Sequence, residues 1–235
     1  MERVSATETH GVDDYLEAIY ELAEEGQRVA QANVARRLGV SRATVSEQIA
    51  RLQKMELVKL DGRAIGLTEH GAVVAEDAVR RHRMAERFLT DVLNMPWHLA
   101  HEEANRFQGG ITEEIERRML KLLGGPATCP HGNPIPGTGA TIDPKLEQLT
   151  SFVTGDVVVL RRLTEDVELD TNALRYFEEH GLVPGARITI KAVAPDGTMT
   201  LAVGFKQSTL QPALTDNLWV RASAQTEQRR AGETV

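Results

Sequence analysis

The sequence predicts a mainly α-helical protein with a β C-terminal domain, and three observations support this fold class. Apolar residues at helical spacing fill the first half of the chain, residues 124–144 are rich in Gly, Pro and Thr, and β-branched runs fill residues 151–220. These changes predict four parts: a winged helix-turn-helix head over 1–73, a helical domain with its linker over 74–144, a small β-barrel over 145–224 and a disordered tail over 225–235.

The head is predicted from three short helices, expected over residues 14–25, 31–38 and 41–55. A tight turn, Gly39-Val40-Ser41, separates the second helix from the third, and Ser41 can cap the helix that follows. Two short apolar runs, Leu57–Leu60 and Ala64–Leu67, are joined by the hairpin signal Asp61-Gly62-Arg63. A hairpin directly after a recognition helix is a wing.

The charge distribution of the head favours double-stranded DNA as a partner. The chain carries a net charge of −7, but residues 26–63 hold eight basic residues against three acidic ones. The alternative is a helical hairpin with a purely structural role, which the basic segment and the wing disfavour. The residues expected to contact DNA lie mainly on the third helix: Arg28, Ser41, Arg42, Thr44, Ser46, Glu47, Gln48, Arg51 and Arg63.

The helical domain holds a candidate metal site. A long helix is expected over residues 72–93, and further helices over 99–108 and 112–123. His82 and Glu86 are four residues apart and share one helix face, while His101 opens the next helix. Two facing helices could direct these imidazoles and this carboxylate at one divalent cation. The same three residues could also be ordinary surface residues.

Two further groups of possible ligands are less complete. Asp14 and Glu17 lie one helical turn apart and could equally be a solvated helix face. Cys129 and His131 form a Cys-x-His pair, but a closed zinc site needs more ligands than these two. An iron or zinc enzyme could also use two histidines and a carboxylate, yet no motif for a general base or a substrate pocket lies nearby, so we do not expect an enzyme.

The sequence also predicts a cytoplasmic location. No apolar run approaches the roughly 20 residues that span a bilayer, and the polar N-terminal residues carry no hydrophobic signal core. The single cysteine, Cys129, excludes an internal disulfide and fits a reducing compartment. No membrane partner is therefore expected.

The order of these parts resembles the diphtheria toxin repressor family of metal-dependent regulators, including its manganese-responsive branch. The resemblance rests on five pieces taken together: Asp14–Tyr20, Val45-Ser46 in the recognition helix, Arg81–Leu89, His101–Ala104 and His131–Gly137. It implies a winged helix-turn-helix head, a helical dimerisation and metal-binding domain, and an SH3-like barrel. It also implies a homodimer that binds a palindromic operator when loaded with Fe(II) or Mn(II), represses metal-uptake genes and has no small-molecule substrate.

Carried over by residue, the resemblance places the family's ancillary metal site on His82, Glu86 and His101, with Asp170 of the barrel as a fourth ligand. The family's primary site falls on Asp14, Glu17, Asn105, Gln108 and Gly109. The last three positions depart from the family, which places Cys or Glu, then Glu, then His there. We therefore expect metal control at the ancillary site.

A weaker, oxygen-rich site of Asp14, Glu17, Asn105 and Gln108 is the less favoured prediction. Either set of ligands suits Mn(II) or Fe(II), and other divalent transition metals could bind in vitro. The alternative to metal control is a metal-independent winged-helix regulator whose surviving metal site is only structural.

Overall fold

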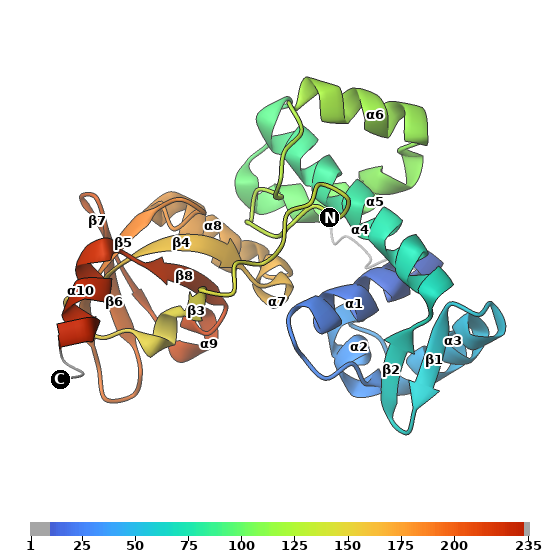
Figure 1. Cartoon of the computed structure of the whole chain (residues 1–235), viewed down its shortest axis with the longest axis horizontal. Coiled ribbons are helices and arrows are strands. Elements are labelled where there is room, and N and C mark those ends of the chain that lie inside the picture. The colour runs from blue at the N-terminus through green and yellow to red at the C-terminus, as the bar shows by residue number, and fades with distance from the viewer. Residues whose placement is uncertain (1–9, 233–235) are drawn as a thin grey trace, which may run out of the picture. The chain divides into compact units, whose positions relative to one another are not determined.

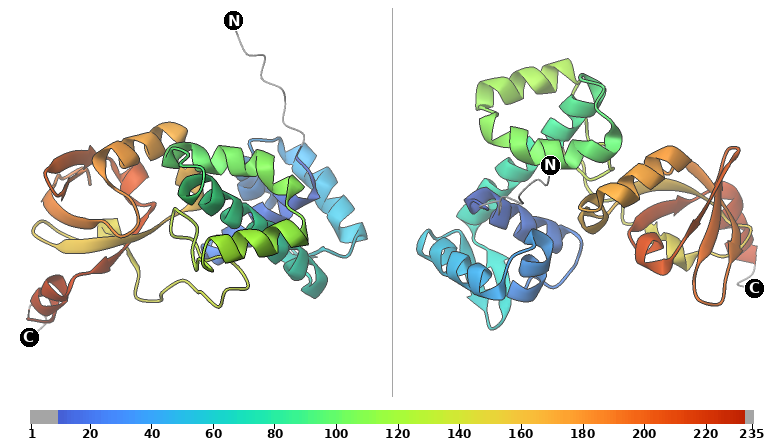
Figure 2. Two further views of the ribbon diagram at one scale, coloured as in Figure 1. Left: turned by 90° about the horizontal axis from the view of Figure 1, so that it is seen from above. Right: turned by 180° about the vertical axis from the view of Figure 1, so that it is seen from behind.

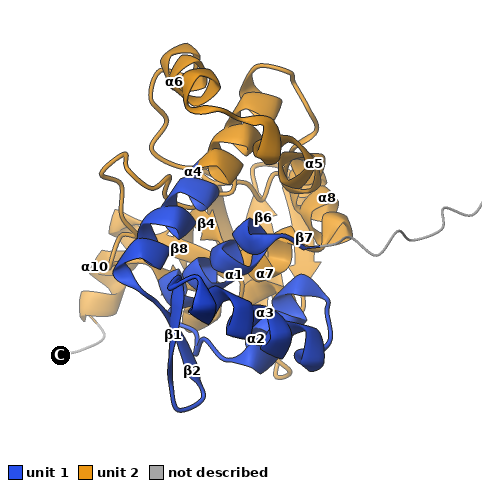
Figure 3. Cartoon of the chain, turned by 90° about the vertical axis from the view of Figure 1, so that its right-hand side faces the viewer, with its two compact units in different colours: residues 1–80 blue, residues 81–235 orange. Residues whose placement is uncertain are grey.

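The computed structural model describes residues 10–232 and is shown in Figure 1. The chain divides into two compact units, Met1–Arg80 and Arg81–Val235, which Figure 3 distinguishes by colour. The long helix α4 (Glu69–Asp91) continues from the first unit into the second. Among residues 10–232, no helix combines the length and the apolar character needed to cross a membrane.

The first unit is the predicted winged helix-turn-helix. It contains α1 (Val12–Glu24), α2 (Gln31–Leu38), α3 (Arg42–Lys54), β1 (Val58–Asp61), β2 (Ala64–Leu67) and the start of α4. The Ser41 side chain caps α3 by accepting a hydrogen bond from the Thr44 amide, as its position in the sequence predicts. The wing is an antiparallel hairpin in which Val58 pairs with Leu67. Buried apolar side chains of all three helices form the core, among them Leu16, Ile19, Val34, Val45 and Leu52.

The second unit begins with a helical region. After α4 come η1 (Trp97–Leu99), α5 (Ala100–Phe107), η2 (Gln108–Gly110) and α6 (Glu113–Leu122). Thr112 caps α6 by accepting a hydrogen bond from the Ile115 amide. A small core of Met84, Ala85, Leu89, Ala104, Ile111, Met119 and Ile135 holds α4, α5 and α6 together.

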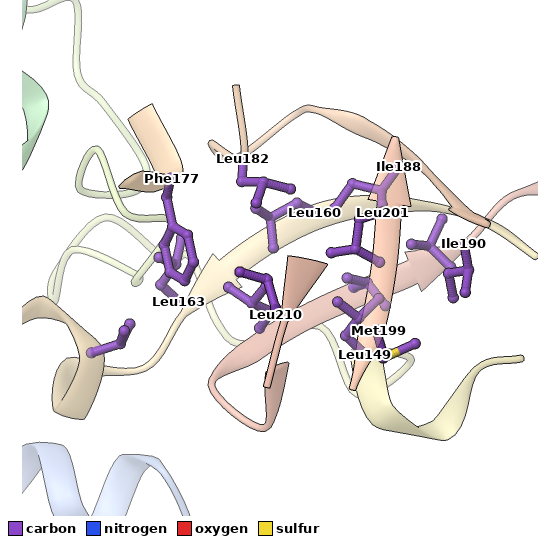
Figure 4. Packing of buried hydrophobic residues seen from close by; sticks show 14 of the residues in the cluster. Leu149, Leu160, Leu163, Phe177, Leu182, Ile188, Ile190, Met199, Leu201 and Leu210 are labelled. Atoms are coloured by element: carbon purple, nitrogen blue, oxygen red, sulfur yellow. The ribbon is translucent and has the colours of Figure 1, made fainter. Parts of the chain in front are cut away.

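A six-stranded antiparallel sheet forms the barrel within the described part of the chain, in the order β3-β8-β4-β5-β6-β7. The strands are β3 (Glu147–Gln148), β4 (Val157–Leu163), β5 (Arg187–Val193), β6 (Met199–Val203), β7 (Lys206–Leu210) and β8 (Leu218–Ala222). Register shifts in the β4–β8 and β5–β6 pairs mark bulges, which bend the sheet around its core. Figure 4 shows this core, with Leu160, Phe177, Ile188 and Leu201 packed between strands and helix.

Short helices connect strands of the barrel. Between β4 and β5 lie α7 (Glu165–Glu168) and α8 (Thr171–His180), and α9 (Pro212–Thr215) precedes β8. The sequence also predicts one short helix among the β runs, over residues 172–179, and α8 confirms it within one residue at each end. The helix α7 was not predicted.

The predicted disordered tail over 225–235 is wrong for most of its length, because residues 224–232 form α10 (Ala224–Gly232). Arg229 pairs with Asp156 at 2.5 Å, and Asp156 is fully buried. Arg230 pairs with Glu147 at 2.9 Å. The polar composition of the tail suggested solvation, but these arginines find acidic partners near the start of the barrel, and the sequence does not reveal such distant pairs.

The Gly- and Pro-rich linker, which runs between the helical region and the barrel (Figure 2), is buried over most of residues 129–136. Gly132 has φ 94°, and a Cβ atom there would lie 2.1 Å from the carbonyl oxygen of Arg161 in β4. The neighbouring carbonyl of His131 accepts a hydrogen bond from the Leu163 amide at 2.9 Å. Glycine is therefore required at position 132 for the loop to contact β4, and this contact buries the His131 side chain completely.

Candidate metal centre

Four segments of the second unit bring titratable side chains together in one buried cluster. The helix α4 supplies His82 and Glu86, α5 supplies His101, the loop before the barrel supplies His131, and α7 supplies Glu168. All five side chains are buried. Charged or titratable groups are rarely buried without a partner or a metal, so this concentration indicates a functional site.

The potential donor atoms lie at short distances from one another. His82 Nε2 is 3.3 Å from Glu86 Oε1 and 3.2 Å from His101 Nδ1, and these last two atoms are 3.2 Å apart. His131 Nδ1 is 3.4 Å from Glu86 Oε1 and 2.8 Å from Glu168 Oε2. Glu168 Oε2 is in turn 3.5 Å from His101 Nδ1. Among the described residues, each of these five atoms therefore lies within 3.5 Å of at least two others.

These distances fit a shell of ligands around one transition-metal ion. With metal–ligand bonds of about 2.0–2.2 Å, neighbouring ligand atoms lie roughly 3–3.5 Å apart in tetrahedral or octahedral geometry. Three imidazole nitrogens and two carboxylate oxygens suit Mn(II), Fe(II) or Zn(II). In addition, Glu86 Oε2 is buried and receives no hydrogen bond from the described part of the chain, a cost that a bound cation would offset.

The pKa values show how the metal-free cluster distributes its charge. Burial would raise the pKa of Glu86, but His131, His82 and His101 outweigh it and hold this pKa well below its usual value. Burial would lower the pKa values of His101 and His131, but Glu168 and Glu86 raise both well above the ordinary histidine value. The metal-free cluster therefore favours the protonated forms of His101 and His131 and the ionised forms of Glu86 and Glu168.

Metal affinity should therefore rise with pH. A cation must displace the protons of His101 and His131, and their raised pKa values extend this competition above neutral pH. By the same linkage, the metal-free fold loses stability as pH rises through the raised imidazole pKa values. Titration calorimetry with Mn(II) between about pH 6 and 8, in buffers of different ionisation enthalpy, measures both the affinity and the released protons. A pH-independent affinity without proton release would contradict this expectation.

Asp170 does not belong to the cluster, so its predicted place in the metal site is a correction. Its Oδ1 accepts hydrogen bonds from the amides of Asn172 at 3.0 Å and Ala173 at 3.1 Å, and thereby caps α8. The barrel contributes Glu165 and Glu168 instead, which lie one turn apart on α7. The sequence signal for this pair is the i, i+3 spacing of two carboxylates shortly after the strand β4.

Glu168→Gln and Asp170→Asn form a matched pair that tests this correction. Loss of a carboxylate donor should weaken Mn(II) binding by at least about 10–100-fold in Glu168→Gln. Asp170→Asn should leave the affinity unchanged, because Asn caps a helix about as well as Asp. Competition with a chromophoric chelator measures both dissociation constants. An equal loss of affinity in Asp170→Asn would indicate that Asp170 is a metal ligand after all.

Neighbouring side chains hold the donors in place. Arg83 is fully buried, pairs with Glu165 at 2.9 Å and donates a hydrogen bond to the carbonyl of Pro134. Asn133 donates a hydrogen bond to Glu168 Oε1 at 2.6 Å and accepts one from Arg162. Such outer contacts orient ligands and tune their affinity.

Trp97 and Cys129 lie beside His131. The Trp97 ring lies 4.6 Å from the His131 ring, and its indole N–H donates to the carbonyl of Pro130 at 3.2 Å. Cys129 lies beside Glu86 and His131, but burial raises the pKa of its thiol to about 12. The Cys-x-His pair of the sequence therefore contributes its imidazole to the cluster, while its sulfur remains a protonated thiol in the metal-free protein.

The positions of the family's primary site divide between the two units. Asp14 and Glu17 lie on α1 of the first unit, whereas Asn105 is exposed on α5 and Gln108 is buried in η2 of the second. Gln108 Oε1 lies 3.1 Å from His82 Nδ1, which connects this residue to the cluster described above. A metal site of Asp14, Glu17, Asn105 and Gln108 stays a prediction.

The residues predicted to contact DNA are accessible on the first unit. Arg28 in the loop before α2, six of the predicted residues of α3 and its cap, and Arg63 at the tip of the wing are exposed, whereas Gln48 is half-buried. The exposed group comprises Arg28, Ser41, Arg42, Thr44, Ser46, Glu47 and Arg51. Val45 and Ile49 of the same helix are buried in the core, so α3 presents a polar face outward.

Three family models match successive parts of the chain. Residues 9–64 match the N-terminal DNA binding domain of iron dependent repressors, and residues 68–137 match the metal binding and dimerisation domain of the same repressors. Residues 147–222 match the FeoA domain, which corresponds to the barrel.

Individual relatives extend this similarity over most of the chain. The iron-dependent repressor IdeR of Mycobacterium tuberculosis (strain ATCC 25618 / H37Rv) is 38% identical over 208 residues, covering 83% of this chain and 90% of the relative. The diphtheria toxin repressor of Corynebacterium jeikeium (strain K411) is 34% identical over 200 residues, covering 76% and 83%.

Solved structures agree with these relatives. A manganese-dependent transcriptional repressor in complex with manganese superposes with a TM-score of 0.80 at 31% identity, covering 91% of this chain and all of the other. The crystal structure of T. acidophilum IdeR gives a TM-score of 0.74 at 28% identity, with coverage of 92% and 99%. With its successive domains and its buried cluster of imidazoles and carboxylates, the chain belongs to the iron-dependent repressor family, which includes the diphtheria toxin repressors.

Proposed function

We propose that this protein is a metal-dependent transcriptional repressor that binds Fe(II) or Mn(II) in the cluster of His82, Glu86, His101, His131 and Glu168. The observation that carries the proposal is the mutual spacing of these five buried donors, 2.8–3.5 Å between neighbouring atoms. Relatives named as iron-dependent or manganese-dependent repressors support the same assignment. They also favour it over a metal-independent regulator with a purely structural site.

The chain's own residues provide the means to couple metal to DNA binding. A bound cation would neutralise Glu86 and Glu168 and join α4, α5, the loop and α7 at one point. Because α4 also extends into the DNA-binding unit, metal can favour one arrangement of that unit over others. Linkage then requires that the arrangement which binds metal more tightly also binds the operator more tightly.

The proposed operator is a palindrome bound by a homodimer. Exposed apolar side chains in the helical region, Phe107, Ile115 and Leu122 among them, would lie against a second copy of the chain. The matched metal binding and dimerisation domain, residues 68–137, covers all three of these residues. Two recognition helices would then enter successive major grooves about 34 Å apart, with Arg42 and Gln48 at base edges and Ser41 and Thr44 at phosphates.

The proposal assigns the centre a regulatory role rather than a catalytic one, as in the repressors to which the chain is similar. Uptake genes for the bound metal are the expected targets. A regulator of this kind acts on the chromosome, so we place it in the cytoplasm, with no membrane partner and no small-molecule substrate.

Fluorescence anisotropy on a palindrome from the protein's own promoter region tests the proposal. Binding is measured at fixed salt with chelator and then with Mn(II), with Fe(II) under anoxia, or with Zn(II), since salt alone shifts such affinities. Tightening that depends on metal supports the proposal, and the ranking identifies the effector. Equal, specific binding in chelator would instead support the metal-independent regulator.

A further inference from the structure

The two ring nitrogens of His82 lie in different surroundings. Nε2 is directed at the donor cluster, 3.3 Å from Glu86 Oε1 and 3.2 Å from His101 Nδ1. Nδ1 lies 3.1 Å from the amide oxygen of Gln108. His82 and Gln108 are both buried, with 3% and 8% of their surfaces exposed.

We propose that Gln108 is a positioning residue of the metal centre, which accepts the Nδ1–H of His82 and so leaves the Nε2 lone pair for the cation. The inference rests on the proposed function. A neutral imidazole has one nitrogen that donates and one that accepts, so a hydrogen bond at Nδ1 fixes which nitrogen can bind metal. Metal-ligating histidines commonly donate their second N–H in this way, and the partner orients the ring.

The position of Gln108 in the chain strengthens the argument. His101 and Gln108 are seven residues apart, at the start and just past the end of α5, so they share one face across two helical turns. The same helical segment therefore brings a ligand and the partner of a second ligand into the cluster. Asn105 lies on this segment too, but its side chain is exposed.

The amide also suits the charge of the cluster. Glu86, Glu165 and Glu168 already place three buried carboxyl groups around His82, His101 and His131. Gln108 accepts a hydrogen bond from His82 without adding a fourth carboxylate to this low-dielectric region. Glutamine in place of the family's glutamate is thus consistent with a hydrogen-bonding role toward His82.

The experiment compares Gln108→Leu, which has a similar size but no acceptor, with Asn105→Ala as the matched control on the same helix. Zn(II) and Mn(II) affinities are measured by competition with a chromophoric chelator. Gln108→Leu should weaken both by about 10–100-fold, the usual effect of removing an orienting partner. Asn105→Ala should bind both metals as the unchanged protein does.

A second measurement reads the tautomer directly, which a merely structural role of Gln108 would not alter. Long-range proton–nitrogen NMR of the metal-free protein should show His82 protonated at Nδ1 and not at Nε2, and Gln108→Leu should lose this single tautomer. Unchanged affinity together with an unchanged tautomer in Gln108→Leu would overturn the inference. Equal weakening in Asn105→Ala would also overturn it, because it would indicate a shared site of Asn105 and Gln108. Absence of metal binding in the unchanged protein would instead reject the proposed function.

Discussion

Replacement of His101 by alanine is expected to abolish the stimulation of operator binding by Mn(II) or Fe(II). His101 Nδ1 lies 3.2 Å from Glu86 Oε1, 3.2 Å from His82 Nε2 and 3.5 Å from Glu168 Oε2. It therefore contacts donors from both α4 and α7, and its loss removes the nitrogen between them. The remaining donors would still bind a cation weakly, but the cation would no longer hold α5 to α4 and the barrel.

The measurement is the anisotropy titration with and without metal, and the expected result is an affinity in metal equal to the affinity in chelator. His180→Ala provides the control, since His180 lies in the same unit and its Nδ1 contacts only the Tyr176 carbonyl among the hydrogen bonds described for it. This control should keep full stimulation. Unchanged stimulation in His101→Ala would show that activation occurs elsewhere, with Asp14, Glu17, Asn105 and Gln108 as the remaining candidates.

The sequence predicted the parts of this molecule that local rules govern. His82 and Glu86 share a helix face because of their spacing, and Ser41 caps α3 because a serine precedes a helix-compatible run. The wing followed from Asp61-Gly62-Arg63 between two apolar runs. Each of these features depends on residues fewer than ten positions apart, where backbone geometry determines which side chains meet.

The rest depended on contacts between distant segments. Glu168 lies 82 positions after Glu86, and no local pattern relates the two residues. The sequence pairs His131 with Cys129 as a possible ligand, whereas its carboxylate partners in the structure, Glu86 and Glu168, come from α4 and α7. The sequence does not predict α10 for the same reason, because its arginines pair with Asp156 and Glu147 far earlier in the chain. Capping and metal ligation both use a carboxylate near a helix start, so the sequence alone does not distinguish the capping role of Asp170 from ligation.

Arg83→Met is expected to cause the largest loss of stability, about 3–5 kcal/mol in the free energy of unfolding of the second unit. Arg83 is 1% exposed, and its guanidinium pairs with Glu165 at 2.9 Å. Burial, followed by the nearby Glu168, raises the pKa of Glu165 to about 7, although Arg83 opposes this shift. Methionine fills similar space but leaves a buried carboxyl group without its cation, which is the costly half of a broken ion pair.

Guanidinium unfolding in chelator, followed by tryptophan fluorescence, measures this loss in the second unit, because both tryptophans, Trp97 and Trp219, lie there. The double variant Arg83→Met/Glu165→Gln should recover most of the stability, since a neutral amide needs no cation. The pH dependence has a definite sign. Removing Arg83 raises the folded-state pKa of Glu165 further above its unfolded value. The loss of stability in Arg83→Met should therefore grow as pH rises above about 7, the pKa of Glu165 in the unchanged protein, and should shrink in acid. A loss that is independent of pH and persists in the double variant would show that Arg83 stabilises the unit through its contact with the Pro134 carbonyl instead.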